Sequence, residues 1–148
     1  MKCMIRECIL EDCVSIVKLN RMEMGYDYPE EVAKMQLEHL LNDTNHKIYV
    51  AVIEDRVVGY IHANNYDLLY APHMKNIMGI AVCSQQKKKG IGKALLSQVE
   101  EWGKRTGAVG VRLVSGIQRQ DAHIFYSKCG YIETKEQKNF KKMFYEEM

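Results

Sequence analysis

The stretch Val82–Leu96, VCSQQKKKGIGKALL, constrains the fold of this 148-residue chain more than any other segment. It joins an apolar run, NIMGIAV, to GKALLSQVEEWGKR, whose apolar residues have the i, i+3, i+4 spacing of an amphipathic helix. A buried strand that turns through glycines into a helix N-terminus is a geometry that binds phosphate, because first-turn amides are free and the helix dipole favours anions. Lysines at the rim would add positive charge. The pattern predicts a polyanion site, although a solvated loop before a well-started helix fits it too.

Length and composition indicate one domain over residues 1–148 with an ordinary globular core. The chain is 47% hydrophobic and 27% charged, and its formal net charge is only +2. So small a charge argues against a general nucleic-acid or membrane binder. No apolar run approaches the roughly 20 residues of a membrane-spanning helix, so we expect no membrane partner.

The cysteine pattern favours reduced thiols and a cytoplasmic protein. The number is odd, and neither a Cys-x-x-Cys pair nor a His/Cys cluster with zinc spacing is present. We therefore expect no metal site and no structural disulfide. The five residues are Cys3, Cys8, Cys13, Cys83 and Cys129.

Periodicity and turn residues predict alternating strands and helices, a mixed α/β sheet. The first helix should begin at Glu11 or Asp12, end near Gly25, and bury Val14, Ile16, Val17, Leu19 and Met22. Residues 64–75 are expected to form a loop. The predicted strands are 2–8, 47–53, 57–63, 76–82 and 109–115, with two more antiparallel strands within 131–145, and the further helices are 26–41, 92–105 and 120–130.

Three phosphate-binding motifs compete for the turn. A Walker A loop would need Gly at Lys87 and Ser or Thr at Ala94, and a dinucleotide fingerprint would need Gly at Leu95. The third is the acyl-CoA loop of the GNAT acetyltransferases, Arg/Gln-x-x-Gly-x-Gly/Ala before a helix with Ala-Leu-Leu. The run KKKGIGKALL from Lys87 resembles it closely, with Lys87 in place of Arg or Gln.

A second motif lies downstream. The segment DAHIFYSKCGY resembles the family pattern Ala-x-x-x-Tyr-x-x-x-Gly-Phe/Tyr, here Ala122, Tyr126, Gly130 and Tyr131. The resemblance covers essentially the whole chain. It implies the GNAT fold, a mixed, mostly antiparallel sheet of six to seven strands with helices on both faces. The run RQDAHIFY from Arg119 resembles the branch that includes aminoalkylphosphonate acetyltransferases.

The resemblance also implies where acetyl-CoA, the cosubstrate, would bind. The strand GIAV would bond the pantetheine as an added strand does, and an amide near Ile80 would polarise the thioester carbonyl. Amides of the turn would hold the pyrophosphate, and Arg119 stands where the family often has a cofactor-contacting Asn. The implied cofactor-binding residues are Ile80, Ala81, Val82, Lys87, Lys88, Lys89, Gly90, Ile91, Gly92, Lys93, Arg119 and Tyr126.

Two catalytic roles follow from the same resemblance. Tyr126 matches the general acid that protonates the leaving thiolate, a task that suits a phenol with a pKa near 10. Many relatives carry a Glu on the strand before the CoA loop to assist the amine, but here that strand has no carboxylate. His73 has the most suitable ordinary pKa for a base. Glu23, Asp27, Asp67 or a water chain remain alternatives.

We therefore expect an N-acetyltransferase that moves an acetyl group from acetyl-CoA to a primary amine of a small molecule. The alternatives are a protein or peptide N-acetyltransferase of the same fold and a CoA-binding module without turnover. A nucleic-acid module built on the lysines is disfavoured by the small net charge and the lack of interleaved aromatic residues. Homodimers are common in the family, so a homodimer stays open.

Overall fold

The computed structural model describes residues 2–145 and divides the chain into two compact units, which meet between Val114 and Ser115. The single-domain prediction therefore stays a prediction, and each unit is described by itself. The elements are β1 (Cys3–Glu7), a 3-10 turn η1 (Leu10–Asp12), α1 (Cys13–Met24), α2 (Glu30–Leu41), β2 (His46–Ile53), β3 (Arg56–Leu68), β4 (Ala71–Val82), a second 3-10 turn η2 (Ser84–Gln86), α3 (Ile91–Arg105), β5 (Val111–Leu113) and, in the second unit, α4 (Gln120–Lys128).

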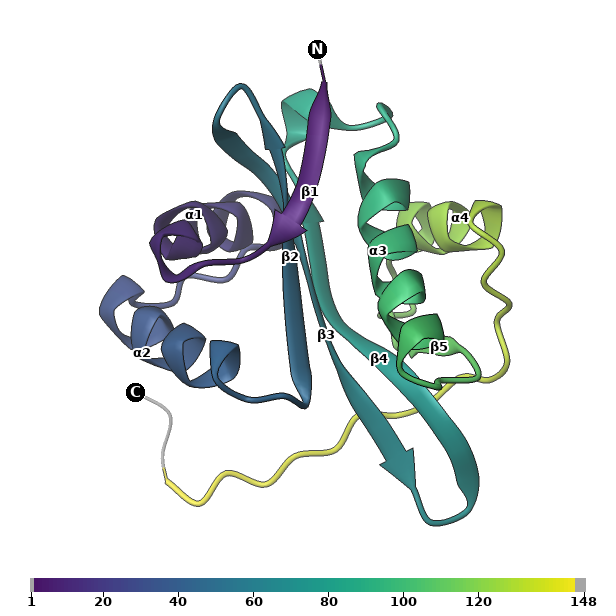
Figure 1. The fold of residues 1–148 in the computed structure, drawn as a ribbon. Helices are drawn as coiled ribbons and strands as arrows, with labels where there is room; N and C mark the ends of the chain where they lie inside the picture. The colour runs from purple at the N-terminus through teal and green to yellow at the C-terminus, as the bar shows by residue number, and fades with distance from the viewer. Residues whose placement is uncertain (1, 146–148) are drawn as a thin grey trace. The chain divides into compact units, whose positions relative to one another are not determined.

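The first unit is built on a mixed sheet with the order β1-β2-β3-β4-β5. Neighbouring strands are antiparallel from β1 to β4, and β5 runs parallel to β4. Helices α1 and α2 cover one face and α3 covers the other (Figure 1). The predicted mostly antiparallel α/β sheet is confirmed, but the described residues form five strands and the prediction of six to seven was wrong.

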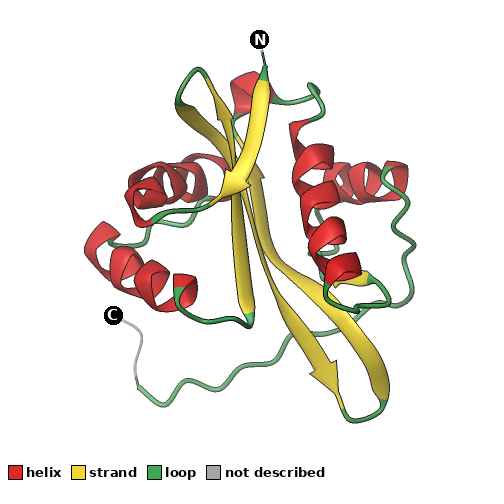
Figure 2. Ribbon diagram, in the orientation of Figure 1, coloured by secondary structure: helices red, strands yellow, loops and turns green. Residues whose placement is uncertain are grey.

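The strands predicted within residues 131–145 do not form. This stretch has no helix or strand (Figure 2). Its apolar side chains are exposed, among them Ile132 and Phe140. Polar residues such as those of KEQKN separate them, so no apolar face is long enough to pack against a core.

The loop predicted over residues 64–75 is instead part of a long β3–β4 hairpin. Only Leu69 and Tyr70 separate the two strands. The side chains of Asn64 and Asn76 lie opposite each other, and Asn76 Nδ2 donates a hydrogen bond to Asn64 Oδ1 at 3.1 Å. The polar residues that suggested a loop thus pair with each other across the hairpin.

The core between α1, α2 and the sheet differs in part from the predicted buried face of α1. Val17 and Leu19 are buried as expected, and Gly25 ends the helix with a φ of 74°. Val14 and Met22, however, are exposed. The helix begins at Cys13, after a 3-10 turn, and its buried face runs through Cys13 and Val17, which are four residues apart. On the opposite face of the sheet, Leu95, Val99 and Trp102 of α3 are buried, which confirms the amphipathic spacing predicted for this helix.

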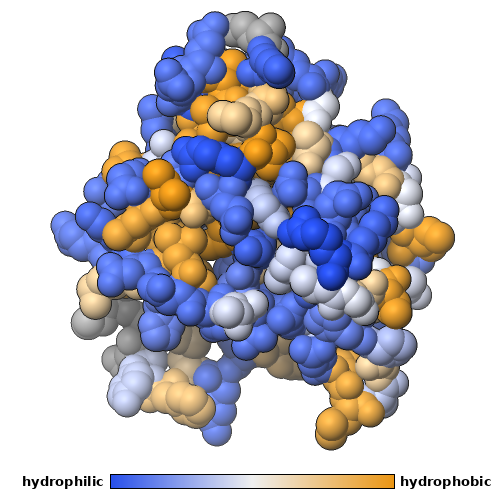
Figure 3. All heavy atoms as spheres, viewed as in Figure 1, coloured by the Kyte–Doolittle hydropathy of each residue, from blue (hydrophilic) through white to orange (hydrophobic). Residues whose placement is uncertain are grey.

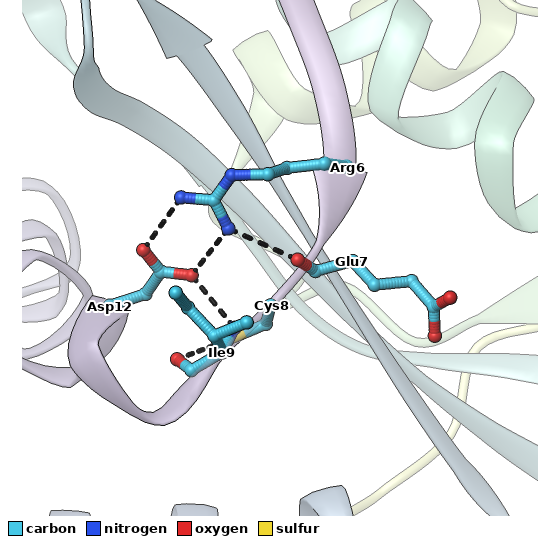
Figure 4. A network of polar contacts seen from close by, with 5 residues as sticks. All are labelled: Arg6, Glu7, Cys8, Ile9 and Asp12. Atoms are coloured by element: carbon cyan, nitrogen blue, oxygen red, sulfur yellow. Dashed lines mark hydrogen bonds and ion pairs between the residues drawn. The ribbon is translucent and has the colours of Figure 1, made fainter.

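A partly buried ion pair joins β1 to the start of α1 (Figure 4). Arg6 donates two hydrogen bonds to the carboxylate of Asp12, at 2.8 and 3.0 Å, and the Ile9 amide donates a third at 2.9 Å. Burial alone would raise the pKa of Asp12, but these hydrogen bonds outweigh burial and hold that pKa below its ordinary value of 3.8. Burial raises the pKa of the neighbouring Cys8 thiol to about 12, which keeps that thiol protonated.

Replacing Asp12 with alanine should lower the free energy of unfolding by about 2 kcal/mol, because Arg6 and the Ile9 amide lose their acceptor. Because folding lowers the pKa of Asp12, its carboxylate stabilises the folded state at pH values above its unfolded-state pKa. That stability is lost as the pH falls through the folded-state pKa of Asp12. Urea unfolding at neutral and acid pH measures both effects. Asp27→Asn is the control, because its pair with Arg21 is exposed. Equal losses in the two variants would contradict the account.

Candidate functional site

Strand β4 has a free outer edge where the cosubstrate is expected. Its pairing with β5 covers only Lys75 to Ile77, whereas its pairing with β3 continues to Val82. From Met78 to Val82, no strand of residues 2–145 pairs with the outer edge. The segment GIAV, with Ile80, Ala81 and Val82, therefore offers unpaired main-chain groups to an extended ligand.

The lysine-glycine turn leads from this edge into the N-terminus of α3. Gly90 is the N-cap, with a φ of 82°, and no side chain caps the helix. The first helical hydrogen bond runs from the Ala94 amide to the Gly90 carbonyl at 3.0 Å, so the amides of Ile91, Gly92 and Lys93 precede it and are not used by the helix. Free amides with a positive dipole end and exposed lysines fit a pyrophosphate.

Glu23, at the end of α1, holds the start of this turn. Its carboxylate accepts hydrogen bonds from the Ser84 amide at 3.0 Å and from Ser84 Oγ at 2.7 Å, and Lys87 Nζ lies 3.6 Å away. Burial would raise the pKa of Glu23, but the Ser84 bonds and the Lys87 charge lower it overall. The contacts occupy this carboxylate, which makes Glu23 a poor base and gives it a positioning role instead.

A pocket of about 660 Å³ opens on the face of the sheet that carries α1 and α2. Apolar residues gather at the surface over these helices, among hydrophilic side chains (Figure 3). Aliphatic side chains form much of the pocket wall, while the loop between α1 and α2 contributes Tyr26, Asp27 and Tyr28. Strand β3 contributes Tyr60 and His62. An apolar hollow with a few polar groups is typical of a small-molecule site.

The sequence analysis missed two residues of that pocket wall, Tyr60, which is buried, and His62, which is partly buried. The Tyr60 hydroxyl donates to Asn20 Oδ1 at 2.5 Å, and burial raises the pKa of this phenol to about 12. A ring nitrogen of His62 lies 2.9 Å from a ring nitrogen of His46. Burial, with a smaller effect of His46, lowers the pKa of His62 to about 4, so His62 is neutral at physiological pH.

His73, the predicted base, belongs to a different cluster. Its Nδ1 lies 2.7 Å from Asp67 Oδ1, and its Nε2 lies 2.9 Å from Nζ of the buried Lys75. That ammonium also donates to Asn65 and sits 3.9 Å from the centre of the Trp102 ring. Both nitrogens of His73 are thus engaged, and its position on β4 is roughly 20 Å along the strand from Ile80. The geometry does not bring His73 and Asp67 to the free edge.

Strand β4 carries the amide side chain of Asn76, which is held by two neighbours. Asn76 Oδ1 accepts a hydrogen bond from Arg112, and its Nδ2 donates to Asn64. Arg112 also stacks 4.1 Å from the centre of the Tyr66 ring. These contacts orient Asn76 within the sheet, and an amide cannot take up a proton from an amine.

The second unit carries the other motif. Arg119 is the N-cap of α4, and the His123 ring lies 2.9 Å from the Gly116 carbonyl, which closes the turn before the helix. Tyr126 packs against Phe125 and Tyr131. Burial raises the pKa of Tyr126 above its ordinary value, more than the nearby Arg119 charge lowers it, so this phenol keeps its proton at neutral pH.

Comparison with known proteins identifies the class. The acetyltransferase (GNAT) family model matches residues 13–131, so the chain belongs to the GNAT family and is an acetyltransferase. An N-alpha-acetyltransferase of Sulfurisphaera tokodaii is 30% identical over 139 residues, covering 88% of this chain and 81% of the relative. The aminoalkylphosphonate N-acetyltransferase of Salmonella typhimurium is 28% identical over 130 residues, covering 87% and 84%. These matches confirm the family resemblance.

Two further matches agree. An uncharacterized N-acetyltransferase of Bacillus subtilis, YhdJ, is 46% identical over 46 residues, which span 30% of this chain and 32% of that protein. The structure of aminoglycoside N-acetyltransferase AAC(6')-Iy in complex with CoA superposes with a TM-score of 0.86, covers 95% of both chains and shares 16% identity. At that identity the superposition shows the fold alone.

Among residues 2–145, no helix has the length and apolar content needed to cross a bilayer.

Proposed function

We propose that this chain transfers the acetyl group of acetyl-CoA to the primary amine of a small molecule by direct attack. The observation that carries the proposal is the free edge of β4 from Met78 to Val82, which runs into the uncapped N-terminus of α3. Acetyl-CoA matches both features. Its amide-containing pantetheine arm can bond to the free strand edge, and its pyrophosphate can bind at the helix N-terminus. Lys87, Lys88, Lys89 and Lys93 supply the charge around it.

One bond between heavy atoms forms and one breaks, and the amine gives up a proton to a base or to solvent. The amine nitrogen attacks the thioester carbonyl carbon, and the carbon–sulfur bond breaks as the tetrahedral intermediate collapses. A main-chain amide near Ile80 stabilises the oxyanion, and Tyr126 gives its proton to the leaving thiolate. The raised pKa of Tyr126 suits this role, because the phenol remains protonated until the thiolate forms.

The pocket beside α1 and α2 is the proposed acceptor site. Tyr26, Tyr28 and Tyr60 offer hydroxyl groups, and Asp27 is the carboxylate among the lining residues. A cationic amine suits such a lining. The N-alpha-acetyltransferase relative favours a second candidate, in which the acceptor is the N-terminal amine of a polypeptide. A cytoplasmic location and a homodimer remain predictions.

Thiol release from acetyl-CoA against a panel of amines tests the proposal. The panel contains aminoalkylphosphonates, aminoglycosides, polyamines, amino acids and short peptides with free N-termini. We expect turnover on one small-molecule class and acetylated product by mass spectrometry. Turnover on peptides alone would favour the second candidate. Tight binding of acetyl-CoA without turnover on any amine would refute the transferase proposal in favour of a CoA-binding module.

A further inference from the structure

His62 lies beside the predicted reaction centre and has no part in the acetyltransfer steps proposed above. In the β3–β4 register, His62 stands directly opposite Gly79, and Ile61 stands opposite Ile80. Opposed residues of antiparallel strands have their Cα atoms about 5 Å apart. His62 is therefore a single cross-strand step from the amide proposed to hold the thioester oxygen. It faces the same side as Gly79, where a Cβ would lie 3.6 Å from the Tyr60 hydroxyl.

His62 also lines the acceptor pocket with one nitrogen free. Its Nε2 is engaged by His46, but its Nδ1 has no hydrogen-bond partner within residues 2–145. His62 Nδ1 is not among the fully buried unpartnered side-chain atoms of residues 2–145, so this nitrogen keeps some exposed surface. A neutral imidazole that donates through Nε2 presents Nδ1 as an acceptor.

Behind His62, a path leads out of the pocket toward solvent. His46 Nδ1 lies 2.9 Å from His62 Nε2, and His46 Nε2 lies 3.9 Å from Asp43 Oδ2. The rings of the two histidines pack against each other with centroids 5.1 Å apart. The exposed fraction of the side chain rises from 20% for His46 to 40% for Asp43. A proton that leaves the pocket would therefore pass His62, His46 and Asp43 in turn before it reaches bulk water.

The other titratable groups around the pocket are less suited to take a proton. Cys13 and Tyr60 are protonated, with pKa values raised by burial. Asp27 lies 3.2 Å from the Arg21 guanidinium. Tyr26 and Tyr28 lie on the loop between α1 and α2 and bring only phenol hydroxyl groups to the pocket wall.

Building on the proposed acetyltransfer, we infer that His62 is the proton acceptor for the attacking amine and that His46 and Asp43 carry the proton to solvent. The bound ammonium first gives one proton to His62 Nδ1, and the lone pair that this frees on nitrogen then forms the carbon–nitrogen bond. The proton on His62 Nε2 passes at the same time to His46 Nδ1, and His46 releases its Nε2 proton toward Asp43 and water. No charge accumulates on His62, which matches its apolar surroundings. The relay regenerates once the two imidazoles exchange tautomers through solvent.

His62→Gln and His46→Gln test the relay, with His39→Gln on the exposed side of α2 as the matched control. We expect kcat/KM for the amine to fall about 100-fold in His62→Gln and about tenfold in His46→Gln, with no change in the control. Exogenous imidazole should restore part of the activity of His62→Gln. The rate of that variant should also keep rising with pH, since the amine must then lose its proton to solvent. Kd for acetyl-CoA should stay within about twofold in all three variants.

The outcomes separate the relay from the transferase proposal. If His62→Gln keeps kcat/KM within about twofold of the wild-type value and has the wild-type pH profile, the relay is overturned. The acetyltransferase proposal then still stands. Loss of activity without imidazole rescue and with an unchanged pH profile would also overturn it, because His62 would then be structural. If His62→Gln unfolds, His46→Gln decides, since His46 lies outside the pocket lining. Absence of turnover in the wild-type protein would overturn both proposals together.

Discussion

Replacing Gly92 with aspartate should raise Kd for acetyl-CoA at least about 100-fold while the protein stays folded. A carboxylate about 4 Å from a phosphate, at an effective dielectric constant of about 20, costs about 4 kcal/mol. The same carboxylate in the first turn of α3 is favourable to the helix by up to about 1 kcal/mol, because it complements the dipole. The substitution therefore separates binding from stability, which an alanine change cannot do.

Gly92→Asn is the matched control, because asparagine has the shape of aspartate without the charge. We expect Kd to rise less than about tenfold in this variant, and calorimetric titration measures both changes. Thermal unfolding should show Gly92→Asp at least as stable as the control. Equal affinities for the two variants would contradict a pyrophosphate at the N-terminus of α3.

Replacing Tyr126 with phenylalanine should lower kcat about 100-fold with little change in Kd for acetyl-CoA, because the leaving thiolate loses its proton donor. The pKa of Tyr126 is raised by burial, so the wild-type rate should hold into mildly alkaline pH and fall only as the phenol ionises. In the variant this alkaline fall should disappear. Steady-state rates across pH, with saturating acetyl-CoA, measure both effects.

Tyr70→Phe is the control for the loss of a phenol, since Tyr70 is exposed at the tip of the β3–β4 hairpin. It should keep the wild-type kcat and the wild-type pH profile. A Tyr126→Phe variant that matches this control would assign Tyr126 to packing against Phe125 and Tyr131 alone.

Features that depend on residues close together in the chain could be predicted from the sequence. The apolar run, the glycines and the amphipathic spacing predicted the strand, the turn and α3, and Gly90 takes the positive φ that such a turn requires. Glu54 and Asp55 lie in the gap between the strands predicted over 47–53 and 57–63, and they form the turn between β2 and β3 with φ values of 50° and 63°. These features depend on neighbours in the chain.

Side-chain neighbours that depend on the register between strands could not be predicted from the sequence. The register places His62 opposite Gly79, and it places His46, on the neighbouring strand β2, diagonally next to His62. Likewise, Glu23 looked like a candidate base, and only the fold brings Ser84 and Lys87 to its carboxylate. His73 had a suitable ordinary pKa, but the hairpin fixes it between Asp67 and Lys75. A two-residue alternation in GYIHANN could have flagged Tyr60 and His62 as sharing a face.

The central claim is that acetyl-CoA binds along the free edge of β4 and at the N-terminus of α3. Amide hydrogen exchange of the full chain, with and without saturating acetyl-CoA, tests it most directly. We expect slower exchange in residues 78–82 and 88–93 on adding acetyl-CoA, and the protection at 88–93 should be lost in Gly92→Asp. Protection confined to other segments, or none at saturation, would contradict the account.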